Sequence, residues 1–100
     1  MLMPMKVIDV CRGCANKGWM PDIIEVTSEV FEECKPYVAQ AIEKKLDFDP
    51  PLVHHGGRVV GKSRIVDDDN LVLTGLMIRR GPTIRAGYIQ GKKTFWEAFE

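Results

Sequence analysis

The chain has 100 residues, of which 45% are hydrophobic and 28% are charged, and its formal net charge at pH 7 is zero. This length and composition predict a single domain over residues 1–100 with a core of its own, and they argue against a disordered ground state. Residues 1–50 carry six Lys/Arg against nine Asp/Glu and residues 51–100 carry eight against five, a basic excess too small to indicate a nucleic-acid partner.

The first 26 residues predict a strand followed by a loop. The apolar run Lys6–Val10 is typical of a short strand. Residues 11–21 contain two glycines, an asparagine and a proline, which favour a loop. The next apolar run, Ile23–Val26, fits either a strand or the approach to a helix.

Residues 27–46 predict an amphipathic α-helix. Thr27 or Ser28 can cap its N-terminus, where three glutamates also place favourable negative charge. Pro36 lies almost opposite the apolar stripe, so we expect a kink that bends the helix around the core, or two shorter helices that meet at Pro36. The stripe recurs with helical spacing and consists of Val30, Phe31, Cys34, Tyr37, Val38, Ala41 and Ile42.

Residues 57–93 predict a β-meander. Asp67–Asn70 is a turn sequence between β-branched runs, which indicates a hairpin. Leu71–Ile78 follows as one nearly continuous hydrophobic strand, and this composition indicates burial on both faces or pairing across an interface. Arg79–Pro82 then turns the chain into a last strand over Thr83–Ile89. The predicted fold is therefore α+β, with one kinked amphipathic helix packed on a small, mostly antiparallel sheet.

The C-terminal segment, residues 94–100, is aromatic. Thr94 and Glu97 have the spacing of a capping box, which favours a helical turn, although a strand over 93–99 fits almost as well. An aromatic cluster at a chain end either packs on its own domain or anchors in a neighbour. Basic side chains at the preceding turn can contact phosphate or an acidic protein surface, or simply solubilise the chain, and the last interpretation is favoured. The residues that we expect at a protein interface are Phe95, Trp96, Phe99, Arg79 and Arg80.

Cys11 and Cys14 form a CxxC motif, in which two thiolates can share a tetrahedral zinc ion. Cys34 and His55, or the neighbouring His54, are the remaining side chains that could complete the site. The same motif could form a dithiol redox centre, or hold two ordinary reduced cysteines, and the last interpretation is favoured because the glycine-rich continuation is a poor helix. An odd number of cysteines, without a secretion signal or an apolar run of roughly 20 residues, indicates a cytoplasmic protein with no membrane association.

A histidine followed by an apolar-Gly-basic triplet, an acidic turn and a strand ending near glycine occurs within residues 55–78. This pattern resembles a strand-turn-strand region of bacteriophage prohead proteases. The resemblance implies that His55 is the catalytic histidine, but no serine follows Ser63, so the nucleophile that the family requires is missing. It therefore implies a phage context rather than a protease. The residues that carry it are His55, Val60, Gly61, Lys62, Asp67, Asp68, Leu71 and Gly75.

From these observations we expect a non-enzymatic structural or accessory protein without a cofactor. It would act through protein partners or self-association, through sheet edges or the aromatic C-terminus. If it is phage-encoded, it would be found in the host cytoplasm or the virion. The alternatives are a small zinc-stabilised binding module that uses Cys11 and Cys14, and a CxxC thiol redox protein.

Overall fold

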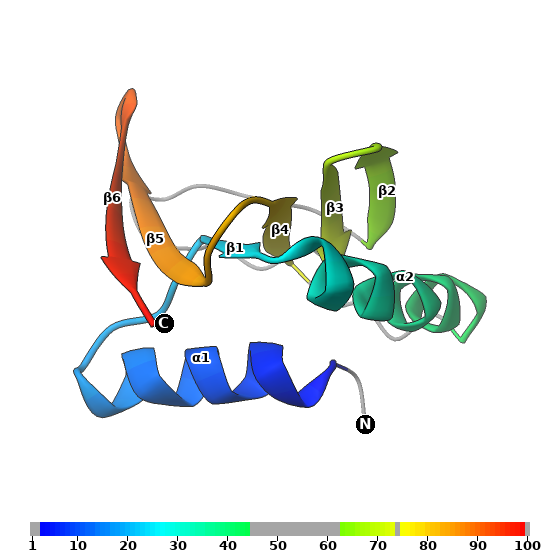
Figure 1. The fold of residues 1–100 in the computed structure, drawn as a ribbon, viewed down its shortest axis with the longest axis horizontal. Helices are drawn as coiled ribbons and strands as arrows, with labels where there is room; N and C mark the ends of the chain where they lie inside the picture. Colours follow the sequence, from blue (N-terminus) through cyan, green and yellow to red (C-terminus); the bar gives the residue numbers. More distant parts are fainter. Residues whose placement is uncertain (1–2, 45–62, 74, 100) are drawn as a thin grey trace.

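The computed structural model describes residues 3–44, 63–73 and 75–99. Two helices pack on the same face of a six-stranded sheet, so the fold is α+β, as predicted (Figure 1). Within the described residues, no helix has the length and apolar character needed to cross a membrane. The elements in chain order are α1 (Met5–Asn16), β1 (Ile23–Val26), α2 (Ser28–Glu43), β2 (Arg64–Asp67), β3 (Asn70–Leu73), β4 (Leu76–Arg80), β5 (Arg85–Gln90) and β6 (Lys93–Ala98).

The strand order in the sheet is β2-β3-β4-β1-β5-β6. β1 is parallel to β4 and antiparallel to β5, and the other neighbours are antiparallel. Of the β-meander predicted over residues 57–93, the order β2-β3-β4 and the pair β5-β6 are correct, but β1 lies between β4 and β5 and interrupts it. Residues 57–62 lie outside the described part of the chain. All four residues of β1 are buried, as expected for a short apolar strand at the centre of a sheet.

The run Leu71–Ile78 forms two strands rather than the single strand that we predicted. Leu73 pairs with Leu76 across a two-residue connection between β3 and β4. Gly75 in this connection has a φ of 85°, a conformation that glycine adopts without the steric cost of a side chain. The continuous hydrophobicity is explained by burial of both strands, since the whole run from Leu71 to Leu73 is inaccessible to solvent.

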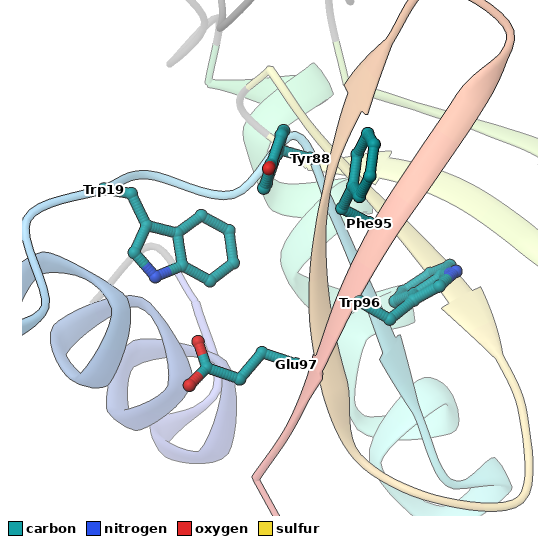
Figure 2. A pocket seen from close by; sticks show the side chains of 5 residues that line it. All are labelled: Trp19, Tyr88, Phe95, Trp96 and Glu97. Atoms are coloured by element: carbon teal, nitrogen blue, oxygen red, sulfur yellow. The ribbon is translucent and has the colours of Figure 1, made fainter.

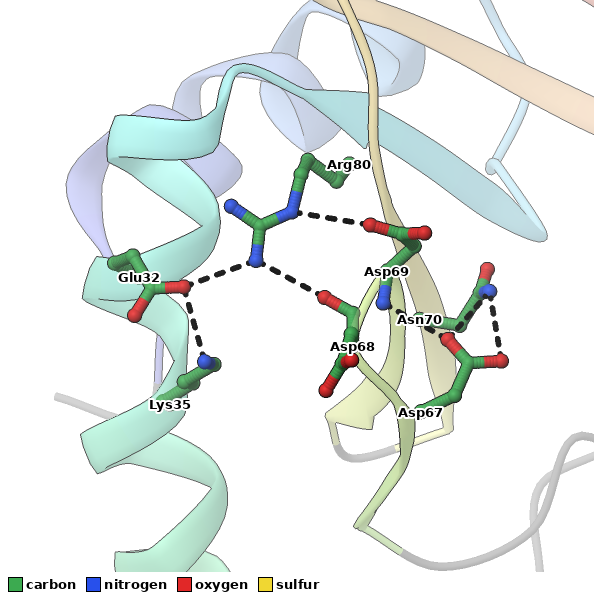
Figure 3. Close-up of polar contacts among 7 residues, drawn as sticks. All are labelled: Glu32, Lys35, Asp67, Asp68, Asp69, Asn70 and Arg80. Atoms are coloured by element: carbon green, nitrogen blue, oxygen red, sulfur yellow. Dashed lines mark hydrogen bonds and ion pairs between the residues drawn. The ribbon is translucent and has the colours of Figure 1, made fainter.

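The turn predicted at Asp67–Asn70 is confirmed and joins β2 to β3 (Figure 3). The Oδ1 atom of Asp67 accepts hydrogen bonds from the backbone N–H of Asp69, at 2.8 Å, and from Nδ2 of Asn70, at 2.9 Å. These bonds favour the charged carboxylate and lower the pKa of Asp67. The turn Asp67–Asn70 is therefore stabilised by hydrogen bonds among its own residues.

The strand predicted over Lys6–Val10 is wrong, because Met5–Asn16 is the helix α1. The loop predicted over residues 11–21 is correct only after the helix, since residues 17–21 belong to neither a helix nor a strand. Its buried side chains, Val7, Val10 and Cys14, recur at i, i+3 and i+7, which is the helical period. The β-branched residues at the start of the segment concealed this period.

Gly13 lies within α1 at a position where an aromatic ring from the C-terminal segment packs against the helix and leaves no room for a side chain. A Cβ atom on Gly13 would lie 2.6 Å from Cε1 of Phe99, closer than side-chain atoms pack. The backbone N–H of Phe99 also donates to the carbonyl oxygen of Ile84, at 2.9 Å. The glycine that suggested a loop is therefore a site of close approach between α1 and the C-terminal segment.

The helix predicted over residues 27–46 is confirmed as Ser28–Glu43, with residues 45 and 46 outside the described part of the chain. Pro36 lies inside α2 on its exposed side, while the kink at this residue stays a prediction. The side chains of α2 that reach the core are Phe31, Cys34, Val38 and Ala41.

Candidate protein-binding surface

β6 forms one edge of the sheet and pairs with β5 along its whole length. The strand alternative for the C-terminal segment is thus correct, and the helical turn is not. Tyr88 of β5 lies opposite Phe95 of β6, and their rings stack with a centroid distance of 5.1 Å and an interplanar angle of 19°. Tyr88 is 37% exposed and Phe95 is 43% exposed. The hairpin therefore presents a stacked aromatic pair to solvent.

Trp19 approaches this pair from the segment that follows α1. Its backbone N–H donates to the carbonyl oxygen of Cys14, at 3.1 Å, which holds the segment against the end of the helix. The Trp19 ring meets Tyr88 edge to face, with centroids 5.7 Å apart and an interplanar angle of 71°. Figure 2 shows Trp19 across from the Tyr88–Phe95 pair, with Tyr88 the nearer of the two rings and the Glu97 carboxylate extending toward Trp19.

The aromatic pocket has a volume of about 340 Å³ and is bounded by Trp19, Tyr88, Phe95, Trp96 and Glu97. Glu97 forms an ion pair with the ammonium group of Lys17, which lies in the turn after α1. The same ammonium group lies 5.3 Å from the ring centroid of Phe99. The ammonium group of Lys17 is thus held beside the pocket by a carboxylate and the face of an aromatic ring.

Trp96 points to the opposite side of β6, away from Trp19 (Figure 2). This direction follows from the alternation of side chains along a strand. Its ring lies 4.0 Å from the guanidinium carbon of Arg85 and 5.0 Å from that of Arg79. Trp96 therefore covers two arginines through cation–π contacts rather than forming one surface with Phe95.

These arginines converge on Glu25 in the central strand β1. Glu25 is only 2% exposed, and it accepts four hydrogen bonds between 2.6 and 3.1 Å from Arg79 and Arg85. Burial raises the pKa of Glu25, but the hydrogen bonds and charges of the two arginines outweigh burial and lower it. The buried carboxylate therefore stays ionised and joins β4, β1 and β5.

Arg80 belongs to a separate polar network between α2 and the β2–β3 turn (Figure 3). Its guanidinium pairs with Glu32 at 3.0 Å and with Asp69 at 3.3 Å, and it donates to the carbonyl oxygen of Asp68 at 3.0 Å. It also lies 4.4 Å from the ring centroid of Phe31. Arg80 thus fastens the turn to the helix.

The five residues predicted at an interface are therefore distributed over different surroundings. Phe95 is exposed beside the pocket, and Phe99 packs on α1 and the core. Trp96 lies over Arg79, which pairs with Glu25, while Arg80 bonds to Glu32 and Asp69. Their role at an interface stays a prediction.

The other edge of the sheet, β2, has exposed apolar side chains that are not among the predicted interface residues. Ile65 is 51% exposed and Val66 is 48% exposed, and all four residues of the strand are exposed. The adjacent apolar residues could have signalled this surface, but the position of β2 at an edge becomes clear only from the strand order. Exposed apolar side chains therefore occur at both edges of the sheet.

The three cysteines lie on helices, with Cys11 and Cys14 one turn apart on α1 and Cys34 on α2. Burial raises the pKa of all three thiols. It raises the pKa of Cys11, and it brings the pKa of Cys14 to about 11 and that of Cys34 to about 12. The thiols are therefore protonated at neutral pH, whereas a redox or nucleophilic cysteine needs a lowered pKa. Residues 3–44, 63–73 and 75–99 contain no cluster of three His, Cys, Asp or Glu side chains that could hold a metal ion, and His55 lies outside these ranges.

Asp22 is a buried carboxylate at the start of β1. Its Oδ2 atom accepts a hydrogen bond from the backbone N–H of Ile89, at 2.8 Å, while Oδ1 is buried and has no hydrogen-bond partner among the residues that the structure describes. The backbone of Asp22 also joins both neighbouring strands, through Gly87 and Met77. Asp22 thus fixes the end of β5 that carries Tyr88.

Comparison with known proteins returned no matching family model, no matching curated protein and no matching solved structure.

Proposed function

We propose that the chain is a non-enzymatic structural or accessory protein that acts by self-association, with the two edges of its sheet as the contacting surfaces. The observation that carries this proposal is the exposed apolar surface at both edges: Ile65 and Val66 on β2, and Phe95 with its neighbour Tyr88 at β6. An edge strand offers unpaired backbone groups to another chain, and exposed apolar side chains there favour pairing. A bacteriophage particle, implied by the resemblance of residues 55–78, is the setting that we propose.

The directions of the strands support a head-to-tail contact. From the pairings across the sheet, β2 and β6 run in the same direction. A second copy in the same orientation could therefore place its β2 beside β6 and continue the sheet. Such a heterologous contact produces a ring if it closes and a filament if it does not.

The side chains on the helix-covered face are compatible with this contact. Ile65 lies opposite Leu71, whose side chain packs in the core, so Ile65 is on the face that the helices cover. Phe95 lies opposite Tyr88, which is two residues from the core residue Ala86, so Phe95 is on the same face. In a continuous sheet, Ile65 of one copy would approach Phe95 of the next.

The test is the mass of the full chain in solution, measured by light scattering over a range of concentrations. We expect a mass above the 11.3 kDa of one chain. Substituting Ile65→Glu should reduce the mass to that of a monomer, because a charged side chain on an edge strand opposes edge pairing. Point substitution is preferable to truncation, since all six residues of β6 pair with β5.

Ile42→Glu is the matched control. Ile42 is 53% exposed and Ile65 is 51% exposed, but Ile42 lies on α2 rather than at a sheet edge. The control should assemble like the unmodified chain. A monomer at every concentration, or equal effects of the two substitutions, would overturn the proposal.

A further inference from the structure

The aromatic pocket combines ring surfaces with one carboxylate. Trp19, Tyr88 and Phe95 supply an apolar lining whose ring faces carry negative electrostatic potential, and Glu97 adds a full negative charge. A cation on a hydrocarbon stem matches both properties, whereas an anion would be repelled by Glu97. The lining therefore selects an organic cation.

The chain itself shows that an alkylammonium group fits this chemistry. Lys17 places its ammonium group against Glu97 and over the ring of Phe99, at the border of the pocket. Both partners of this ion pair are partly exposed, so the pair contributes little to stability and a ligand can compete with it.

The open form of the site favours a side chain over a free small molecule. Tyr88 and Phe95 remain substantially exposed, and the Glu97 side chain is 39% exposed. Sites for free small ligands enclose most of the ligand, which this pocket does not do. A side chain whose backbone lies outside the pocket needs no such enclosure. Edge strands such as β6 bind extended segments in this way, with pockets that receive individual side chains.

We propose that the aromatic pocket binds an alkylammonium group, presented as a lysine side chain of a partner protein. The hydrocarbon stem packs on Trp19 and Phe95, and the ammonium group pairs with Glu97 in competition with Lys17. This site goes beyond the self-association proposed above and does not require it.

The test is a titration followed through the indole N–H resonance of Trp19 in a two-dimensional NMR spectrum. The probe is a blocked tripeptide with a central lysine, and the control is the same peptide with norleucine, which keeps the stem and lacks the charge. We expect the lysine peptide to shift the Trp19 signal more than the Trp96 signal, since the Trp96 ring projects to the other side of β6, over Arg85 and Arg79. Equal shifts with the norleucine peptide would overturn the proposal.

Tetramethylammonium distinguishes a side-chain ligand from a free small cation. It has the charge without the stem or the peptide backbone, so it should bind more weakly than the lysine peptide. Tighter binding of tetramethylammonium would contradict the assignment of a protein side chain. Running each titration on the Ile65→Glu variant as well separates this proposal from self-association, because the pocket of a chain that no longer assembles should still bind the lysine peptide.

Two substitutions distinguish a binding role of the Lys17–Glu97 ion pair from a structural role, because their expected effects on peptide binding are opposite. Glu97→Gln should weaken binding of the lysine peptide about fivefold, because the carboxylate that pairs with the cation is lost. Lys17→Met should strengthen binding about twofold or more, because the competing ammonium group is removed. Glu33→Gln, an exposed residue on α2, should change nothing. A loss of binding in both Glu97→Gln and Lys17→Met would sink the proposal.

Discussion

Gly81 lies directly against the side chain of Glu25. A Cβ atom on Gly81 would be 2.2 Å from Cδ of Glu25, and the backbone N–H of Gly81 donates to the carbonyl oxygen of Val26 at 2.8 Å. The turn after β4 thus covers the buried carboxylate, and only a residue without a side chain fits there.

Gly81→Ala should therefore destabilise the protein. The added methyl group must displace a carboxylate that four hydrogen bonds hold in place, and overpacking of this kind costs about 2 kcal/mol. Chemical denaturation of the two proteins measures the difference. In a Glu25→Ala background the same substitution should cost less, because the atoms it meets are absent. Equal costs in both backgrounds would refute the steric explanation.

The pH dependence of stability tests the ionised state of Glu25. Its pKa is lower in the folded protein than the ordinary value of about 4.3 for an unfolded chain. The contribution of Glu25 to the free energy of unfolding is therefore complete above that value and is lost as the pH falls through the lower pKa of the folded state. Chemical denaturation at about ten pH values between pH 6 and pH 2 should show this decrease in the free energy of unfolding.

Glu25→Gln should remove that part of the pH dependence and destabilise the protein at neutral pH. Two arginines would then share a neutral partner, and removing one member of a buried ion pair costs about 3 kcal/mol. Glu32→Gln is the control, since Glu32 also pairs with an arginine but is exposed. If Glu25→Gln and Glu32→Gln have similar effects, the buried cluster is not the stabilising element that we describe.

The thiols should react slowly at neutral pH. Burial raises the pKa of all three cysteines, so little of the reactive thiolate is present. Alkylation of the folded chain by iodoacetamide should start at Cys11, the cysteine that is only half-buried, and should accelerate above the ordinary thiol pKa of about 8.5. Rapid modification of Cys11 or Cys14 at pH 7 would instead support the thiol redox alternative.

The elements that the sequence predicted well are those whose signal is local. The stripe on α2 and the turn at Asp67–Asn70 depend on spacing and turn chemistry within a few residues, and both are confirmed. α1 was missed because its β-branched residues and Gly13 suggested other structures. The signal that contradicted them, the spacing of Val7, Val10 and Cys14, was present in the sequence.

The strand order and the site could not be predicted because they depend on contacts between distant residues. The insertion of β1 between β4 and β5 brings Glu25 to Arg79 and Arg85, which are 54 and 60 residues away. Trp19 contacts Tyr88 only because the packing of α1 places Trp19 beside β5. The aromatic character of the C-terminal segment is evident from the sequence. The placement of Phe95 and Trp96 on opposite sides of β6 can be derived only once the segment is known to be a strand.

The most direct test of the account is the solution mass of the unmodified chain beside the two matched isoleucine variants. The sheet-edge contact predicts an assembly for the unmodified chain and for Ile42→Glu, and a monomer for Ile65→Glu. A monomeric unmodified chain, or an assembly that Ile65→Glu leaves intact, would contradict it.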